Sequence, residues 1–246
     1  MNVLTFDSQE KFNEAGANII TSLVQTNPHA VLGLATGGTP VGIYEQIVKD
    51  YKRGLVSFRG ITSFNLDEYV GLPSDHSESY RTYMQEHLFA HVDLQPEQTH
   101  IPNGNAPDPE AECRSYDELI ERVGPIDLQL LGIGHNGHIG FNEPAHALLR
   151  GTHIVELAEE TRKANARFFD QPAQVPRQAI TMGVGTILQA KMIVLAVRGA
   201  DKAEIVHRAL IGPITTECPA SLLQTHPHLV VLLDEAAGKQ VKGLFK

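Results

Sequence analysis

Short runs of apolar residues alternate along this sequence with segments that have helical spacing. Continuous apolar runs of about 4–8 residues are typical of strands that are buried on both faces of a sheet. Such strands separated by helices predict an α/β fold with a mainly parallel sheet and helices on both faces. We expect strands over five segments: Ala30–Leu34, Ile61–Asn65, Asp127–Leu131, Met192–Val197 and Leu229–Leu233.

Two helices have recognisable starts. The segment Asp7-Ser-Gln-Glu10 resembles a capping box, apolar residues follow it at helical spacing, and Asn27-Pro28 ends the pattern. A second helix is expected to start at Pro40, with Thr39 as its N-cap. No internal repeat or linker is evident, so we predict a single domain over residues 1–246.

Charge and composition exclude several classes of protein. The formal net charge is −9 and no Lys/Arg tract is present, whereas binding to nucleic acid requires a concentrated basic surface. No apolar run approaches the ~18 residues of a membrane span, and the first residues lack the regions of a secretory signal. Cys113 and Cys218 lie far apart in the sequence, and we expect both to be reduced thiols. We therefore expect a cytoplasmic protein with no membrane or nucleic-acid partner.

Two turns that follow strands have the features of an anion site. The segment Ala35-Thr-Gly-Gly-Thr-Pro40 combines two glycines with the start of a helix, whose amide groups and partial positive charge favour an anion. Gly199-Ala-Asp-Lys202 opens another helix with a lysine, which is unfavourable there unless an anion is bound. A tight capped turn and a solvated lysine would explain the same residues. Taken together, the two turns favour a phosphate site.

Two adjacent carboxylates, Asp67 and Glu68, follow the expected strand Ile61–Asn65. Neighbouring side chains on a strand point to opposite faces, so at most one of the two enters a pocket. That carboxylate could serve as the base that removes a proton from carbon, or it could be a helix cap. Spacing alone does not choose between Asp67 and Glu68.

A glycine-rich loop runs from Leu131 to Pro144 and contains His135, His138 and Glu143. A histidine that a carboxylate orients can carry protons near neutral pH. The spacing matches neither a helical His-Glu-x-x-His site nor a Cys/His finger, so we expect no metal. Structural histidines remain the alternative. Further along, Arg167 could bind phosphate in a bidentate manner or form a surface salt bridge.

From about Ala30 through Asp234 the chain resembles the glucosamine-6-phosphate deaminase family, also called glucosamine-6-phosphate isomerases. The resemblance rests on an ordered set of segments: ATGGTP, FNLDEY, GHNGHIGFNEP, ANARFFD, MGVGT, GADK and LQTHP. The related 6-phosphogluconolactonases share the fold and a similar Gly-His loop, but Phe141-Asn-Glu-Pro144 looks like the deaminase version.

The resemblance implies a Rossmann-like fold and a reaction that converts glucosamine 6-phosphate to fructose 6-phosphate and ammonia, without cofactor or metal. It implies that Asp67 is the base at C2 and that His138, oriented by Glu143, assists ring opening. It also implies a set of substrate-binding residues: Thr36, Gly37, Gly38, Thr39, Arg167 and Lys202.

One catalytic position departs from the family pattern, because Asn136 stands where many members have aspartate. Asparagine can hold an imidazole by a hydrogen bond but cannot stabilise its cation by charge, so Glu143 must carry more of that role. Because shorter members of the family without allosteric control resemble this chain, we expect no activation by an acetylated sugar phosphate.

Two other functions are compatible with the same scaffold: a lactonase, and a non-catalytic sugar-phosphate sensor. Such sensors generally carry a DNA-binding segment, for which the N-terminal residues leave no room, and they have no need to retain Asp67, His138 and Glu143 together. The oligomeric state cannot be read from the sequence, which leaves a homo-oligomer open.

Overall fold

The computed structural model describes residues 1–166, 169 and 175–245. Within this part of the chain, seven strands form one sheet in the order β1-β10-β9-β6-β2-β3-β5, and every neighbouring pair is parallel. The strand bounds are β1 Asn2–Phe6, β2 Val31–Leu34, β3 Thr62–Asn65, β5 Thr99–His100, β6 Leu128–Leu131, β9 Met192–Val197 and β10 Leu229–Asp234. The five predicted strands are confirmed to within one residue at each end.

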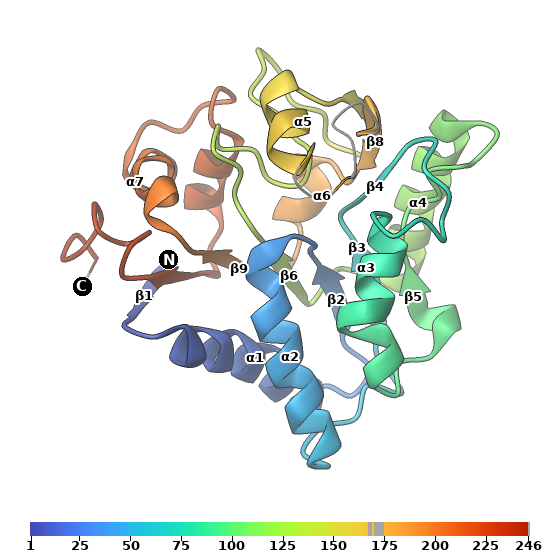
Figure 1. Ribbon diagram of the computed structural model, residues 1–246, viewed down its shortest axis with the longest axis horizontal. Helices are drawn as coiled ribbons and strands as arrows, with labels where there is room; N and C mark the ends of the chain where they lie inside the picture. The colour runs from blue at the N-terminus through green and yellow to red at the C-terminus, as the bar shows by residue number, and fades with distance from the viewer. Residues whose placement is uncertain (167–168, 170–174, 246) are drawn as a thin grey trace.

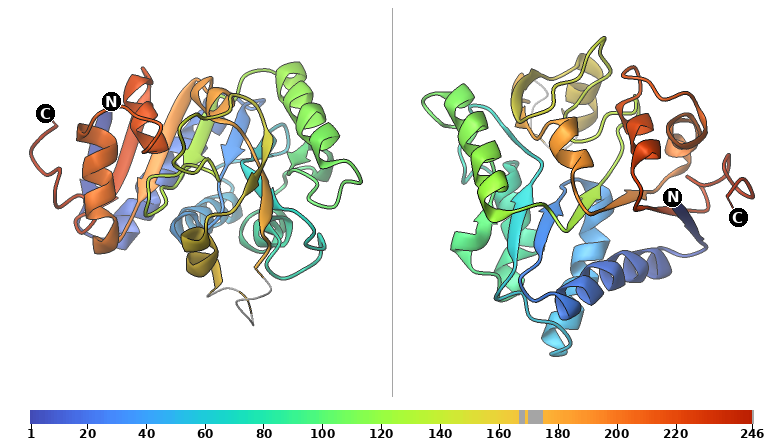
Figure 2. Two further views of the ribbon diagram at one scale, coloured as in Figure 1. Left: turned by 90° about the horizontal axis from the view of Figure 1, so that it is seen from above. Right: turned by 180° about the vertical axis from the view of Figure 1, so that it is seen from behind.

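Helices cover both faces of this sheet, as predicted. Helices α1, α2 and α3 lie on one side, while α4, α6 and α7 lie on the other (Figures 1 and 2). The bounds are α1 Gln9–Thr26, α2 Gly38–Lys52, α3 Tyr80–His87, α4 Pro109–Val123, α5 Glu159–Asn165, α6 Val184–Leu188 and α7 Ala203–Ile211. Among the helices of the described residues, none is both long and apolar enough to cross a membrane.

The starts of the first two helices differ in how they are capped. Ser8 caps α1 by accepting a hydrogen bond from the Lys11 amide, and Asn27 ends the helix, as predicted. The predicted N-cap Thr39 of α2 is wrong, because the helix begins at Gly38 and Gly37 is its cap. Gly37 has a φ of 102°, which favours glycine, and it provides no capping side chain. The first-turn amides of α2 therefore have no side-chain acceptor from the cap residue.

A small second sheet adjoins the first. The described residues form it from three antiparallel strands in the order β4-β8-β7, with bounds β4 Asp67–Tyr69, β7 His153–Glu156 and β8 Gln178–Thr181. Strand β4 starts two residues after β3 ends, and Asp67 pairs directly with Thr181 of β8. The second sheet thus extends from the carboxyl end of β3, the edge at which ligands collect in parallel sheets.

Candidate active site

A cleft of about 240 Å³ lies at the carboxyl edge of the parallel sheet. Four neighbouring strands, β9, β6, β2 and β3, each end near one of the predicted groups. Lys202 follows β9, His138 follows β6, Gly37 follows β2 and Asp67 follows β3, and all four residues line the cleft. The structure therefore brings together groups that lie up to 165 residues apart in the sequence (202 − 37).

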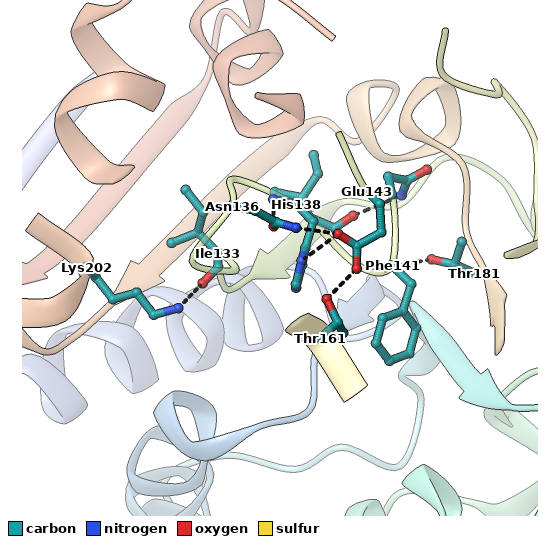
Figure 3. Close-up of polar contacts among 10 residues, drawn as sticks. Ile133, Asn136, His138, Phe141, Glu143, Thr161, Thr181 and Lys202 are labelled. Atoms are coloured by element: carbon teal, nitrogen blue, oxygen red, sulfur yellow. Dashed lines mark hydrogen bonds and ion pairs between the residues drawn. The ribbon is translucent and has the colours of Figure 1, made fainter. Parts of the chain in front are cut away.

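One end of the cleft is suited to an anion. Thr36, Gly37, Gly38 and Thr39 line it, and the first-turn amides of α2 contribute partial positive charge there. A Cβ built at Gly37 or Gly38 meets no atom within 4 Å, so the space above this backbone is open. Lys202 lines the same cleft and its Nζ donates to the carbonyl oxygen of Ile133 at 3.0 Å (Figure 3).

The phenol of Tyr83 fixes the peptide at Gly37, since its Oη donates to the Gly37 carbonyl oxygen at 2.6 Å. We expect Tyr83→Phe to weaken binding of inorganic phosphate about 2–10-fold, the usual net worth of one hydrogen bond. Isothermal titration calorimetry with phosphate measures this change. As a control, Tyr51→Phe removes a phenol from the far end of α2, and its binding should match that of the original protein. Equal affinity in Tyr83→Phe would show that the contact does not shape the site.

The two adjacent carboxylates have different surroundings. Asp67 lines the cleft, whereas Glu68 accepts hydrogen bonds from the amides of Tyr69, Tyr80 and Arg81 at 2.9, 3.0 and 3.1 Å. Glu68 therefore binds first-turn amides of α3 beside the N-cap Ser79, and of the two carboxylates Asp67 is the one that lines the cleft. Burial raises the pKa of Glu68, and these amide donors oppose that rise.

Asp67 is buried against an aromatic wall. Tyr80 lines the cleft beside it, and the rings of Tyr80 and Phe141 stack with centroids 6.1 Å apart. Burial raises the pKa of Asp67 to about 8, and the nearby charge of Glu68 adds to the rise. A carboxylate whose pKa is raised into this range is a stronger proton acceptor than an ordinary aspartate, as base catalysis requires.

Three side chains surround the carboxylate of Glu143. His138 Nδ1 lies 3.3 Å from Glu143 Oε2, Asn136 Nδ2 donates to the same oxygen at 2.6 Å, and Thr161 Oγ1 donates to Oε1 at 2.5 Å (Figure 3). The side chains of His138 and Glu143 are 18% and 12% exposed, so water screens this contact only partly. The arrangement joins a histidine to a carboxylate at the edge of the cleft.

Asn136 does not hold the imidazole ring. Its amide nitrogen binds Glu143, and its Oδ1 accepts from the backbone amide of His138 at 3.2 Å. The expectation that asparagine would hydrogen-bond to the ring is therefore wrong. Asn136 instead fixes the carboxylate and the backbone that carries the histidine.

Glycines bring the histidine loop close to its neighbours. A Cβ at Gly134 would lie 2.2–2.4 Å from three atoms of the His138 ring, so the ring packs directly on the bare backbone. A Cβ at Gly140 would lie 3.0 Å from Thr181 Oγ1 and 3.7 Å from Asp67 Oδ2. Thr181 also accepts a hydrogen bond from the Phe141 amide at 3.0 Å, which ties the loop to the strand opposite Asp67.

The remaining predicted residues take different places. His135 lies at the rim, where its Nε2 pairs with Asp201 Oδ2 at 2.6 Å. Arg167 lies outside the described residues. Among the residues that are described, no group of three or more His, Cys, Asp or Glu side chains could hold a metal ion.

Sequence reasoning did not identify Thr161, Tyr80, Thr181 or Gly134. Thr161 lies on α5, eighteen residues beyond Glu143, and no spacing rule connects the two. Thr181 reaches the site through the pairing of β4 with β8. Tyr80 reaches it because Glu68 binds the amides at the start of α3.

A family model and a curated relative both match most of this chain and agree on the family. The family model described as glucosamine-6-phosphate isomerases/6-phosphogluconolactonase matches residues 7–231. A glucosamine-6-phosphate deaminase from Lachnoclostridium phytofermentans is 52% identical over 232 residues, which cover 94% of this chain and 98% of the relative. Both matches extend over all four strands that end at the cleft.

Two solved structures share the architecture. A monomeric glucosamine-6-phosphate deaminase superposes with a TM-score of 0.95 at 47% identity, covering 98% of this chain and 100% of the other. A 6-phosphogluconolactonase from Trypanosoma cruzi superposes with a TM-score of 0.78 at 17% identity, covering 98% and 97% of the two chains. The second likeness shows the Rossmann-like α/β fold alone.

Proposed function

This chain belongs to the family of glucosamine-6-phosphate isomerases and 6-phosphogluconolactonases, and we propose that it converts glucosamine 6-phosphate and water into fructose 6-phosphate and ammonia. Relatives that share about half of its residues are named for the deaminase, whereas the lactonase shares the fold alone. The observation that carries the proposal is the shared cleft, in which Asp67 and His138 face a space that also contains the anion end and Lys202.

The anion end supports binding of the substrate through its phosphate. In the proposal, the amides of Gly37, Gly38 and Thr39 and the ammonium of Lys202 bind the phosphate oxygens, with Thr36 beside them and Arg167 as a further cation. The phosphate is remote from the reacting carbons, so this contact mainly orients the substrate. The sugar would then extend across the cleft toward His138 and Asp67.

Ring opening is the first chemical step. His138 takes the proton of the anomeric hydroxyl and returns a proton to the ring oxygen, so that the ring C–O bond breaks and an aldehyde forms. The Glu143 carboxylate, 3.3 Å from Nδ1, stabilises the imidazolium that exists between the two transfers. Asn136 keeps that carboxylate in place through its amide.

Isomerisation and loss of the amine follow. Asp67 removes the C2 proton, which the neighbouring aldehyde acidifies, the aldehyde oxygen takes up a proton from solvent, and an enolamine with a C1–C2 double bond forms. Return of a proton to C1 gives a C2 imine, and water adds to that carbon and displaces ammonia to leave the ketone. One water is consumed, so the enzyme acts as a hydrolase on an amino sugar phosphate. Each positioned acid or base would contribute roughly 10²–10⁴-fold to the rate.

The route needs a proton carrier, a base and an anion site, so the proposal includes neither cofactor nor metal. We further propose a cytoplasmic enzyme with one domain over residues 1–246 and a small-molecule substrate. A homo-oligomer stays a prediction, since one structural neighbour is named as monomeric.

An ammonia-release assay with glucosamine 6-phosphate tests the proposal. We expect steady release that EDTA does not reduce and that N-acetylglucosamine 6-phosphate does not stimulate. In parallel, 6-phosphogluconolactone is offered to the same preparation. Hydrolysis of the lactone without ammonia from the amino sugar would replace the deaminase by the lactonase, and loss of activity with EDTA would bring back a metal mechanism.

A further inference from the structure

Thr161 contacts the acid–base pair from a different element. Asn136, His138 and Glu143 belong to one loop, whereas Thr161 lies on α5. Its side chain is buried, with the residue 5% exposed, and its hydroxyl donates to Glu143 Oε1 at 2.5 Å. That distance is in the range of charge-assisted O–H···O⁻ bonds, which are stronger than neutral ones. Figure 3 shows Thr161 and Asn136 on the two oxygens of the same carboxylate.

The direction of the hydroxyl is informative. A threonine in a helix commonly bonds back to a carbonyl of its own helix, as Thr21 does with the Asn18 oxygen in α1. Thr161 instead reaches a residue eighteen positions away. Its branched Cβ restricts χ1, so the helix backbone determines where the hydroxyl points. The position of α5 therefore determines whether Glu143 Oε1 has a donor.

We infer that Thr161 is a positioning residue for ring opening, which holds the Glu143 carboxylate in the orientation and charge state that faces His138. The inference rests on the proposed deaminase function and adds to it a residue that couples α5 to the acid–base pair. Thr161 lines the cleft, but its hydroxyl donates to Glu143, so in this inference it acts through that carboxylate.

Electrostatics agree with this geometry. Burial by itself would raise the pKa of Glu143, but the close contact and charge of His138, with the hydrogen bonds from Thr161 and Asn136, together lower it below its usual value. The cations of α5 are directed elsewhere within the described residues: Arg162 Nη2 donates to the Val175 carbonyl oxygen at 3.4 Å, and Lys163 Nζ pairs with Glu159 at 2.6 Å. Among the described residues in contact with the Glu143 carboxylate, His138 is titratable, and Thr161 and Asn136 are neutral donors.

The decisive variant is Thr161→Val, which keeps the shape of the side chain and removes the donor. We expect kcat for ammonia release to fall on the order of tenfold with KM nearly unchanged, because the lost bond is to a charged group that acts in the chemical step. The pKa of Glu143 should rise, and a carbon-13 NMR titration of its labelled side-chain carboxyl measures that change directly, because Asp67, with a pKa of about 8, sets the acidic limb of the kcat–pH profile. Thr161→Ser keeps the hydroxyl and should restore both kcat and the pKa of Glu143.

Controls separate this role from a structural one. Thr21→Val removes a hydroxyl from an equally buried helical threonine, 6% exposed, outside the cleft, and should leave kcat and the pH profile unchanged. If Thr161→Val does not fold, Thr161→Ala replaces it, because alanine favours the helix and also lacks the donor.

The outcomes are distinguishable. No ammonia from the unaltered enzyme would refute the proposed function itself. Ammonia release at the original kcat, or an unshifted pKa of Glu143, in Thr161→Val would overturn the positioning role of Thr161. A loss that Thr161→Ser does not restore would also overturn it, since the hydroxyl would then not be the cause.

Discussion

Replacing Asp67 by asparagine is expected to lower exchange of the substrate C2 proton by about 10²–10⁴-fold and to stabilise the folded protein at the same time. The loss of exchange follows from removal of the base, whose contribution is of that size. In the proposed mechanism the phosphate binds the first-turn amides of α2 and Lys202 and not Asp67, so substrate binding should persist. Opposite effects on activity and stability are typical of a side chain that is kept in an unfavourable environment for chemical reasons.

The gain in stability follows from the pKa of Asp67, which burial raises from the ordinary 3.8 to about 8. Between these pH values the unfolded chain releases a proton that the folded protein retains, so the stability of the original protein falls as pH rises. Asparagine does not titrate and avoids this loss. The difference in melting temperature should therefore be absent near pH 4 and largest above pH 8, where the pKa change corresponds to roughly 6 kcal/mol, or about 12–24 °C.

Proton NMR of glucosamine 6-phosphate in D₂O measures the exchange, and calorimetric scans across this pH range measure the stability. Glu68→Gln is the matched control, because it neutralises the adjacent carboxylate that faces α3 and not the cleft. Its exchange rate should stay close to that of the original enzyme. Near-normal exchange in Asp67→Asn would remove Asp67 from the mechanism.

A single methyl group at Gly134 should lower ammonia release by about 10²–10⁴-fold, as much as loss of the histidine itself. The added Cβ would lie 2.2–2.4 Å from atoms of the His138 ring, which must then leave its position beside Glu143. Gly134 is not among the described glycines with positive φ, so alanine fits the backbone there. We therefore expect the melting temperature of Gly134→Ala to change little.

A double-mutant cycle tests this explanation. His138→Ala removes the ring and makes room for the methyl group, so Gly134→Ala should cause no further loss in that background. Additive losses from the two substitutions would mean that Gly134 acts independently of the ring. The steady-state rate of ammonia release gives the values for all four proteins of the cycle.

The part of the fold that the sequence predicted is the largely buried centre of the parallel sheet. All four residues of β2 and of β6 are buried, so their runs were recognisable. Strand β1 was missed because it is an edge strand whose residues are mostly exposed or half-buried, and β5 has only two residues. The second sheet was also missed, since β7 contains no fully buried residue and has no apolar run.

The candidate site was predictable where a residue follows a strand directly. Asp67, His138 and Lys202 were found in this way, because the carboxyl ends of parallel strands meet at one edge. The choice between Asp67 and Glu68 needed the position of α3, whose amides bind Glu68. Thr161 could not be found, because its contact depends on how α5 packs over the loop and not on any local pattern.

The four neighbouring strands that end at the cleft would also favour sugars with a particular number of carbon atoms. Adjacent strands lie about 4.8 Å apart, and a sheet with this much buried apolar contact does not stretch to suit its ligand. For a sugar held by its phosphate, the reactive carbon reaches Asp67 only if the right number of carbons lies between them. A pentose phosphate would stop one bond short, and a misplacement of about 1 Å can cost on the order of 10²-fold in rate. In the proposed mechanism, the fixed spacing of the sheet would thus discriminate against shorter sugars.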